Sequence, residues 1–438
     1  MTKIKYVIIT IVILALMAVS AAAYIMDSKT KPIVLEFGMF AGSNWDVANA
    51  NSYVIIDKAI EQFEKKYKNV KIHYYSGILK DDYSEWFSKQ VLLGKTPDVF
   101  MILSNDFNQF ASMGILKELD ELIDNDETFD KNNYFKTALL SGEYHGIQYA
   151  LPYETVPNLM FVNKTLLKKE GIDVPNSDWT WRDLYNICEK VTKDINGDGI
   201  LDQFGIYNYD WLDAARTNGA VLFDENEMKI DLSDEKVVEA VKFIKTLYDL
   251  NHEQNVTQED FDSGNVVFMP LSFADYRTYK RYPYKIKKYL NFQWDCITFP
   301  AGKDGGNISE VSTLLMGISS KTAHEELAWE FLKLLTYDEE IQMDIFRYSQ
   351  GASVLEKVTS SQEAERILQE DVEKSEKVID NLLLSRVITE GTVPPKILKY
   401  NEAITIANGG IQEIIRYDKD VQSSLKILER KINQYLKQ

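Results

Sequence analysis

The chain has 438 residues, of which 45% are hydrophobic and 12% aromatic, so it is long enough to form two domains with cores of their own. Its 67 acidic and 49 basic residues give a formal net charge of -18. A nucleic-acid-binding surface needs clustered Lys and Arg to displace counterions from phosphates, so the charge argues against nucleic acid as a partner.

The chain begins with a membrane-targeting segment. Lys3 and Lys5 precede an apolar run over residues 6–26. The length of this run suits an uncleaved spanning helix, while "SAAAY" offers an A-x-A-like cleavage site, so residues 1–30 are either a membrane anchor or a signal peptide. No cysteine follows the run to carry a lipid. Because basic residues stay cytoplasmic, we expect the remainder outside the cytoplasm, membrane-anchored or secreted at the cell surface.

Strand and helix patterns alternate in the next part of the chain. Strands are predicted over 32–40 ("PIVLEFGMF"), 70–75 ("VKIHYY") and 97–103 ("PDVFMIL"). Apolar residues at helical spacing predict helices over 54–67 and 81–95 between them. This order predicts parallel pairing with right-handed crossovers.

A second alternating set begins near residue 158, and its helix starts are marked by capping residues. Asn163 precedes "KTLLKK" as a helix-start residue. Two capping boxes are predicted, from Thr180 to Asp183 and from Thr322 to Glu325.

The remaining elements are mostly helical. A helix is predicted over 234–250, and the chain is almost wholly helical after about residue 360. The last helix, over 421–435, has too few heptads for a coiled coil and is expected to pack on a domain. No long Gly/Ser linker is present, so we expect the chain to cross between its domains on ordered strands.

The sequence carries no motif of the common catalytic families. It lacks G-x-S-x-G, H-E-x-x-H, Walker A and Rossmann glycine patterns, so no catalytic residue is proposed. His145 lies in a loop of interest, but a general base also needs a positioned partner. Cys188 and Cys296 lie in apolar contexts and are expected to be buried, unpaired thiols. Paired carboxylates are harder to exclude, so an extracytoplasmic glycosidase remains the enzymatic alternative.

Several segments together resemble one protein family. In chain order they are "GKTPDVFMI", "FASMGILKELDELI", the most specific stretch "GIQYALPYETVPNLMFVNKTLLKKEGIDVPNSDWTWRDL", "FDSGNVVFMPLSFADY", "ITFPAGKDGG", "LLMGISSKT" and "AHEELAWEFLKLLT". They are similar to the bacterial extracellular solute-binding proteins of family 1, the maltose-binding-protein type that serves ABC sugar importers. The likeness spans roughly residues 33–355. Val267 and Phe268 replace the Ala-Met pair that is usual in the family.

The resemblance implies an α/β fold of the type II periplasmic-binding-protein kind, with two hinge-linked lobes and a ligand cleft between them. It implies an N-terminal lobe over 33–157 and 312–347, and a C-terminal lobe over 158–311 and 348–438.

The resemblance also implies a function. The chain is expected to be the substrate-binding protein of an ABC transporter, which captures a mono- or oligosaccharide by lobe closure and delivers it to the permease. It is expected to be a monomer, to need no cofactor and to perform no bond chemistry, with the carbohydrate, the permease subunits and the membrane as partners. A cell-surface sugar sensor without transport stays open, because the Val267–Phe268 departure and the missing lipid-modified cysteine differ from the family pattern.

Candidate ligand-binding residues follow from the rule that ligands of open α/β sheets lie beyond the carboxyl ends of the strands. Sugars need aromatic planes for their C–H faces and polar groups for their hydroxyls. Loops that offer both supply Asn44, Trp45, Asp46, Asn105, Asp106, Tyr153, Glu154, Asp210, Trp211, Phe273, Asp275, Tyr276, Tyr348 and Ser349.

The stretch "DINGDGILDQFG" (194–205) resembles the first half of a calcium-binding loop. Gly205 stands where a bidentate Glu is needed, and a strand-like segment follows, so a regulatory calcium sensor is not expected. A structural Ca²⁺ and an ion-free turn, in which Asp and Asn bond their own backbone, both remain open. The candidate metal ligands are Asp194, Asn196, Asp198, Ile200 through its carbonyl, and Asp202.

Overall fold

The structure is a computed structural model that describes residues 32–49, 51, 53–225, 227–252, 254–280, 292–370, 372 and 379–438. The predicted anchor or signal peptide, residues 1–30, lies outside the described residues. Within the described ranges, every helix is too short or too polar to cross a membrane.

One mixed sheet runs through the molecule in the order β2-β1-β3-β12-β6-β10-β7, with β11 and β13 also pairing with β6. The strands are β1 (Ile33–Gly38), β2 (Val70–Tyr74), β3 (Val99–Ile102), β6 (Ala150–Asn163), β7 (Phe204–Ile206), β10 (Val266–Ser272), β11 (Trp294–Ile297), β12 (Val311–Ile318) and β13 (Ala352–Ser353). The first three pair in parallel with β1 in the middle, which confirms the pairing predicted from the alternating pattern.

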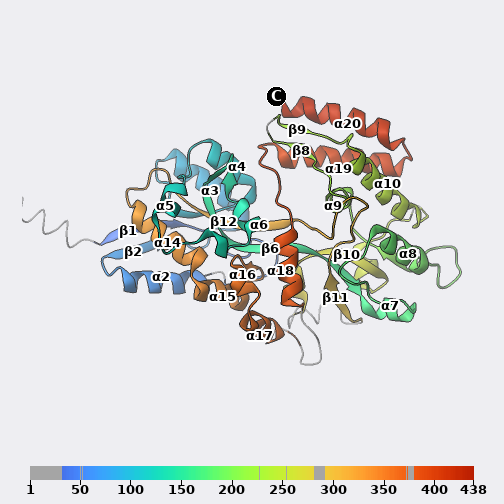
Figure 1. Cartoon of the computed structure of the whole chain (residues 1–438), viewed down its shortest axis with the longest axis horizontal. Helices are drawn as coiled ribbons and strands as arrows, with labels where there is room; N and C mark the ends of the chain where they lie inside the picture. The colour runs from blue at the N-terminus through green and yellow to red at the C-terminus, as the bar shows by residue number, and fades with distance from the viewer. Residues whose placement is uncertain are drawn as a thin grey trace, which may run out of the picture.

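Strand β6 joins the two lobes. It is 14 residues long and almost wholly buried. Its first part pairs with β12 and its last part with β10 and β11, all antiparallel. In Figure 1 it runs through the centre of the molecule from one lobe into the other. The chain therefore crosses between the lobes on an ordered strand, as the absence of a flexible linker predicted.

The first lobe is built around β1–β3 and β12. Phe331 lies edge-on to Phe37, with ring centroids 5.5 Å apart, and to Phe63 at 5.2 Å. An aromatic ring from a helix therefore packs directly on the sheet. Its helices are α2 (Val54–Lys66), α3 (Lys80–Leu92), α4 (Ser104–Ser112), α5 (Asp120–Asn125), α6 (Lys136–Leu140), α14 (Glu325–Tyr337) and α15 (Glu339–Tyr348). A 3-10 turn (Lys131–Asn133) and a hairpin of β4 (Glu143–Tyr144) and β5 (Ile147–Gln148) complete it.

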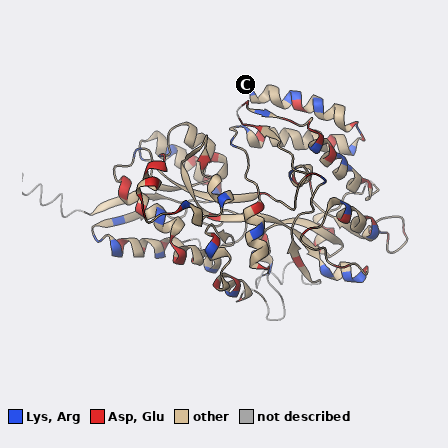
Figure 2. Ribbon diagram, in the orientation of Figure 1, with Lys and Arg blue, Asp and Glu red and all other residues tan. Residues whose placement is uncertain are grey.

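The second lobe surrounds β7, β10 and β11. Its helices are α7 (Lys164–Lys169), α8 (Trp181–Val191), α9 (Trp211–Thr217), α10 (Glu235–Asp249), α11 (Gln258–Asp262), α12 (Phe273–Lys280), α19 (Tyr400–Arg416) and α20 (Val421–Leu436), with a hairpin of β8 (Phe223–Asp224) and β9 (Lys229–Ile230). As predicted, the last helix packs on a domain, since α20 buries one face against α10 and α19. Lys and Arg are interspersed with Asp and Glu along the helices of both lobes (Figure 2).

Two of the three predicted helix starts are confirmed. The Asn163 side chain accepts a hydrogen bond from Leu166 N at 2.9 Å, and Thr180 forms a reciprocal capping box with Asp183. The third prediction is wrong. Helix α14 begins at Glu325, and its cap position is His324, which makes no side-chain cap. Thr322 lies two residues before that position, where its hydroxyl donates to Asp98 at 2.5 Å and accepts from His324 N at 3.1 Å.

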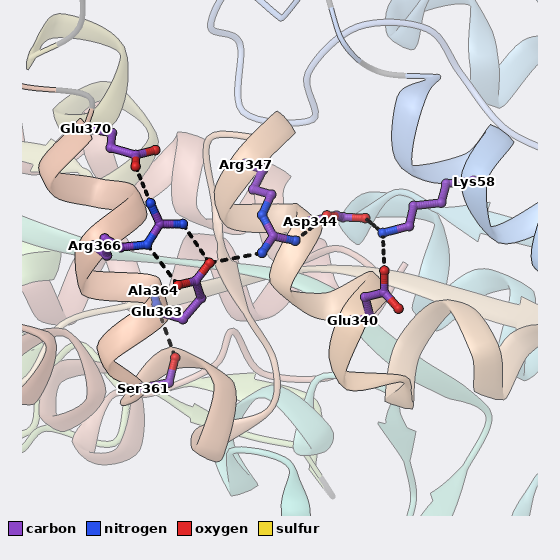
Figure 3. A network of polar contacts seen from close by, with 9 residues as sticks. All are labelled: Lys58, Glu340, Asp344, Arg347, Ser361, Glu363, Ala364, Arg366 and Glu370. Carbon is purple, nitrogen blue, oxygen red and sulfur yellow. Dashed lines mark hydrogen bonds and ion pairs between the residues drawn. The ribbon is translucent and has the colours of Figure 1, made fainter.

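Three further helices, α16 (Glu356–Thr359), α17 (Gln362–Glu370) and α18 (Asn381–Glu390), bury residues in the same hydrophobic cluster as the first-lobe core. A chain of ion pairs fastens α17 to this lobe through α15 and α2 (Figure 3), and it comprises Lys58, Glu340, Asp344, Arg347, Glu363, Arg366 and Glu370. The lobe boundary expected at residue 348 stays a prediction.

Both cysteines are free and buried, as expected from their apolar contexts.

Candidate functional site

Two adjoining cavities, of about 550 and 180 Å³, lie between the lobes. They share the lining residues Glu310, Pro394, Pro395, Lys396 and Tyr400. We call this pair of cavities the cleft. Its floor is formed where β12 begins and where residues 392–396 pass from α18 to α19.

The first-lobe wall comes from segments that follow strands. Asn44 and Trp45 lie in the loop after β1, and Asn105 and Asn108 lie on α4, directly after β3. The carboxyl ends of parallel strands meet at one edge of a sheet, which explains why these segments come together. Polar groups from both loops therefore face the cleft.

Two polar atoms on this wall are buried without a hydrogen-bond partner among the described residues. They are Trp45 Nε1, a donor, and Asn108 Oδ1, an acceptor. The Trp45 indole N–H nevertheless points at Glu154, and its effect opposes the rise in pKa of that carboxyl. Both atoms are covered by the protein in this arrangement, although the two side chains line the cleft.

The second-lobe wall comes from α9 and from the start of α19. Arg216 lines the larger cavity, Tyr400 lines both, and Asn401 lines the smaller one. The two walls touch at one point, where Asn401 Nδ2 donates to Asn105 Oδ1 at 2.8 Å. The lobes are thus in direct polar contact beside the cleft.

Arg216 and Lys396, the basic residues in the described lining of the larger cavity, both have partners within the protein. Arg216 binds Asp213 at 2.9 Å and Glu310 at 2.6 Å. Burial, reinforced by the charge of Asp210, raises the pKa of Asp213 to about 7. Burial lowers the pKa of Lys396 to about 8, and its ammonium donates to the Ser141 carbonyl oxygen at 2.6 Å.

A third cavity, of about 30 Å³, adjoins the same β1 loop. It brings together five predicted site residues: Asn44, Tyr153, Glu154, Tyr348 and Ser349. Glu154 is 4% exposed and accepts from Ser349 Oγ at 2.5 Å and from Gly351 N at 2.6 Å. Burial raises the pKa of its carboxyl, against the effect of the Ser349 hydrogen bond.

Two other predicted residues near the first-lobe wall have partners within the chain. Asp46 binds Lys80 at 2.7 Å on the surface, and Asp106 accepts from Ser84 Oγ at 2.6 Å. Burial raises the pKa of Asp106.

The structure does not bring the remaining predicted residues to the described lining of the three cavities. Asp210 caps α9, and Asp275 binds Ser272 at the start of α12. Trp211 is 3% exposed and donates to Asn408 Oδ1 at 2.7 Å. Phe273 and Tyr276 are buried, and the Tyr276 hydroxyl accepts from Ile379 N at 2.7 Å. These side chains serve as caps and core, the ordinary roles of such residues.

Sequence reasoning missed the second-lobe wall and the floor of the cleft. Arg216, Glu310, Lys396, Tyr400 and Asn401 were not predicted, although each lines a cavity. One signal was available: the Pro394–Pro395 pair marks a break between two helical patterns, where a crossing segment is expected. The pairing of Arg216 with Glu310, 94 residues apart, left no local signal.

In the loop proposed for calcium, the Asp and Asn side chains accept backbone N–H groups. Asp194 accepts from Gly197 N at 2.6 Å and Gly199 N at 2.7 Å, and Asp202 accepts from Ile195 N at 2.8 Å. Asn196 and Asp198 likewise accept backbone N–H groups two residues on. Among the described residues, no three His, Cys, Asp or Glu side chains are placed to hold a metal ion. The structural Ca²⁺ and the ion-free turn both stay predictions.

Several solved structures have a similar fold, and three of them are named here. A cyclic alpha-maltosyl-1,6-maltose binding protein of Arthrobacter globiformis matches with a TM-score of 0.75 and 15% identity, over 93% of this chain and 99% of that one. The sugar-binding protein MalE of Xanthomonas citri matches with a TM-score of 0.74 and 14% identity, over 92% and 97%. An ABC substrate-binding protein of Listeria monocytogenes in complex with cycloalternan matches with a TM-score of 0.68 and 19% identity, over 93% and 99%.

At these identities the likeness shows the fold, which confirms the predicted two-lobe α/β architecture. The family model described as bacterial extracellular solute-binding protein matches residues 48–341, which is more than half of the chain. The chain therefore belongs to the bacterial extracellular solute-binding protein family.

Proposed function

We propose that the protein captures a carbohydrate in the cleft between its lobes and delivers it to an ABC permease. The observation that carries the proposal is the lining of the cleft, which places the rings of Trp45 and Tyr400 beside side-chain amides of the β1 loop, α4 and α19. Amides donate and accept hydrogen bonds as sugar hydroxyls do, and an aromatic ring can cover the C–H face of a sugar, so this lining suits a carbohydrate. The carbohydrates named for the structural neighbours support the same class of solute.

The proposal excludes bond chemistry. Glu310, an acidic residue of the cleft floor, is bound to Arg216, and Glu154 is held by Ser349 and the Gly351 N–H. Both carboxylates are thus engaged by groups of the protein, whereas a glycosidase needs one carboxylic acid and one carboxylate directed at the scissile bond.

Titration calorimetry against a panel of mono- and oligosaccharides tests the proposal. At least one member should release heat, and Asn108→Ala should weaken that binding by about tenfold, since a neutral hydrogen bond contributes about 0.5–1.5 kcal/mol. Asn132→Ala, which removes an exposed amide far from the cleft lining, is the matched control. Absence of heat with every sugar, together with release of reducing ends from an oligosaccharide, would overturn the proposal.

We further propose that residues 1–30 direct export, leaving the mature protein either anchored or secreted at the cell surface. The apolar run after Lys3 and Lys5 supports export in both cases. The mass of the mature protein distinguishes them, because cleavage after the "SAAAY" motif removes the first part of the chain.

A further inference from the structure

The cations of the cleft are committed to partners inside the protein. Arg216 is the clearest case, because its two terminal nitrogens bind two different carboxylates, Asp213 and Glu310. The three side chains are only 11%, 15% and 23% exposed, so water screens these ion pairs weakly. A guanidinium binds the carboxylate of a ligand through its terminal N–H groups, and here both terminal nitrogens already bind carboxylates of the protein.

The Lys396 side chain lies against residues of the first lobe that also line the smaller cavity. Its ammonium donates to the Ser141 carbonyl oxygen at 2.6 Å and lies 4.8 Å from the centre of the Phe107 ring. Its backbone N–H donates to Glu225 Oε1 at 2.9 Å. Lys396 therefore contacts the first lobe through its side chain and the second lobe through its backbone.

In the larger cavity, acidic side chains outnumber the side chains of Lys and Arg. Its described lining contains Glu143, Glu225 and Glu310 against Arg216 and Lys396. His145 also lines it, and its ring lies edge-on to Tyr144 with centroids 4.2 Å apart. An anionic solute would enter beside three carboxylates and would have to displace Glu310 to reach Arg216. Like-charge contacts across a buried surface cost several kcal/mol.

We infer that the cleft selects an uncharged carbohydrate and excludes acidic ones, and that Glu310 is a specificity-determining residue because it holds Arg216 away from the solute. The inference rests on the proposed function. It agrees with the side-chain amides in the lining of the smaller cavity, which can bond sugar hydroxyls and bring no charge. A site of this kind accepts sugars by their hydroxyls and rejects uronic, sulfated or phosphorylated sugars.

Calorimetry at pH 7.5, where an ordinary imidazole is mostly neutral, separates the outcomes. The probes are neutral trisaccharides (maltotriose, cellotriose, xylotriose) and acidic ones (trigalacturonate, triguluronate). We expect at least one neutral probe to bind and every acidic probe to bind at least about tenfold more weakly. Tighter binding of an acidic probe than of every neutral one would overturn the inference and leave carbohydrate capture standing. No binding of any probe would overturn both.

Glu310→Gln tests the named residue, with Glu225→Gln as its control. Both variants remove one negative charge from the lining of the same cavity, but only the first removes a partner of Arg216. We expect Glu310→Gln to reduce the preference for neutral over acidic probes by about tenfold, and Glu225→Gln to reduce it much less. Equal reductions would show that total charge, and not the hold on Arg216, sets the preference. The wild-type panel tests the exclusion of acidic sugars even if Glu310→Gln does not fold.

Discussion

Lys396 connects the lobes and should make stability depend on pH. Burial lowers its pKa from an ordinary value of 10.5 to about 8, so the native protein releases this proton at lower pH than the unfolded chain does. Between these values the unfolded chain holds more protons, and the free energy of unfolding contributed by Lys396 therefore rises with pH. Below about pH 8 the native state carries a buried ammonium at a cost.

Lys396→Met should remove this dependence. Urea titrations from pH 7 to 10.5 measure the free energy of unfolding of both proteins. We expect the value for the variant, relative to that for wild type, to be highest below pH 8 and to fall as pH rises. Lys357→Met, which removes a lysine with 77% side-chain exposure, is the control for general alkaline effects. A constant difference between Lys396→Met and wild type across the range would show that Lys396 is not buried as a charge.

A strand pattern before a residue was not enough to place that residue at the cleft. Asn44, Trp45 and Asn105 follow clear strands, and all three line the cleft. Trp211 and Tyr276 carry the same aromatic chemistry, yet they are buried in the cores, because residue type does not reveal which face of a helix points inward. Pairs such as Arg216 and Glu310 depend on the whole chain path and leave no local pattern.

Between elements, the ion pairs that join α2 to α15 differ in burial, and burial should decide how much each contributes to stability. Lys58 binds Glu340 and Asp344, both at 2.7 Å, but the two carboxylates are 65% and 2% exposed (Figure 3). Asp344 also binds Arg347 at 2.7 Å. Removing Glu340 leaves Lys58 still paired with Asp344, whereas removing the Asp344 carboxylate takes away a buried partner of two cations.

Asp344→Asn should therefore lower the free energy of unfolding by about 1–3 kcal/mol, because it takes away a buried partner of two cations. Glu340→Gln is the matched control, and it should change stability by at most about 1 kcal/mol because exposed ion pairs contribute little. Urea denaturation of both variants gives the comparison. Equal losses would mean that the distance of an ion pair, and not its burial, governs its contribution here.

The turn over residues 194–205 gives a prediction about metal dependence. Its carboxylates already accept backbone N–H groups, and these hydrogen bonds, chiefly that from Gly199, lower the pKa of Asp194. We expect the melting temperature to be the same in EDTA and in millimolar Ca²⁺, because the turn is complete without an ion. A rise of several degrees with Ca²⁺ would show instead that the loop rearranges into a calcium site, with the ligands that the sequence suggests.

Helix and strand order could be predicted well, and the exceptions have local causes. Thr180 stands at the cap position of α8, so it forms the reciprocal box with Asp183. Thr322 lies two residues before the cap position of α14, and its hydroxyl donates to Asp98, 224 residues away. Where a helix begins relative to a capping pattern cannot be read from spacing alone.

For the whole molecule, the sequence predicted two α/β sets but not their union into one sheet. Strand β6 pairs with first-lobe strands over its first residues and with second-lobe strands over its last, so one extended segment belongs to both lobes. A continuous apolar run of this kind indicates a buried strand without showing how many partners it has. The cleft is a product of that union, since its walls come from α4 on one side and from α9 and α19 on the other.

The contact between Asn105 and Asn401 gives a test of lobe closure. The two residues are 296 positions apart and lie on opposite walls, so their 2.8 Å hydrogen bond exists only while the lobes are together. A neutral hydrogen bond contributes about 0.5–1.5 kcal/mol, so Asn105→Ala or Asn401→Ala should weaken solute binding about 2- to 13-fold by favouring the open state. Because the two residues share one hydrogen bond, the double variant should bind the solute hardly more weakly than either single variant.

Calorimetry with the tightest-binding sugar gives the affinities of wild type, both single variants and the double variant. The control is Gln109→Ala, on the exposed face of α4. Additive losses would mean that each amide acts separately, and the closed state would then not depend on this bond.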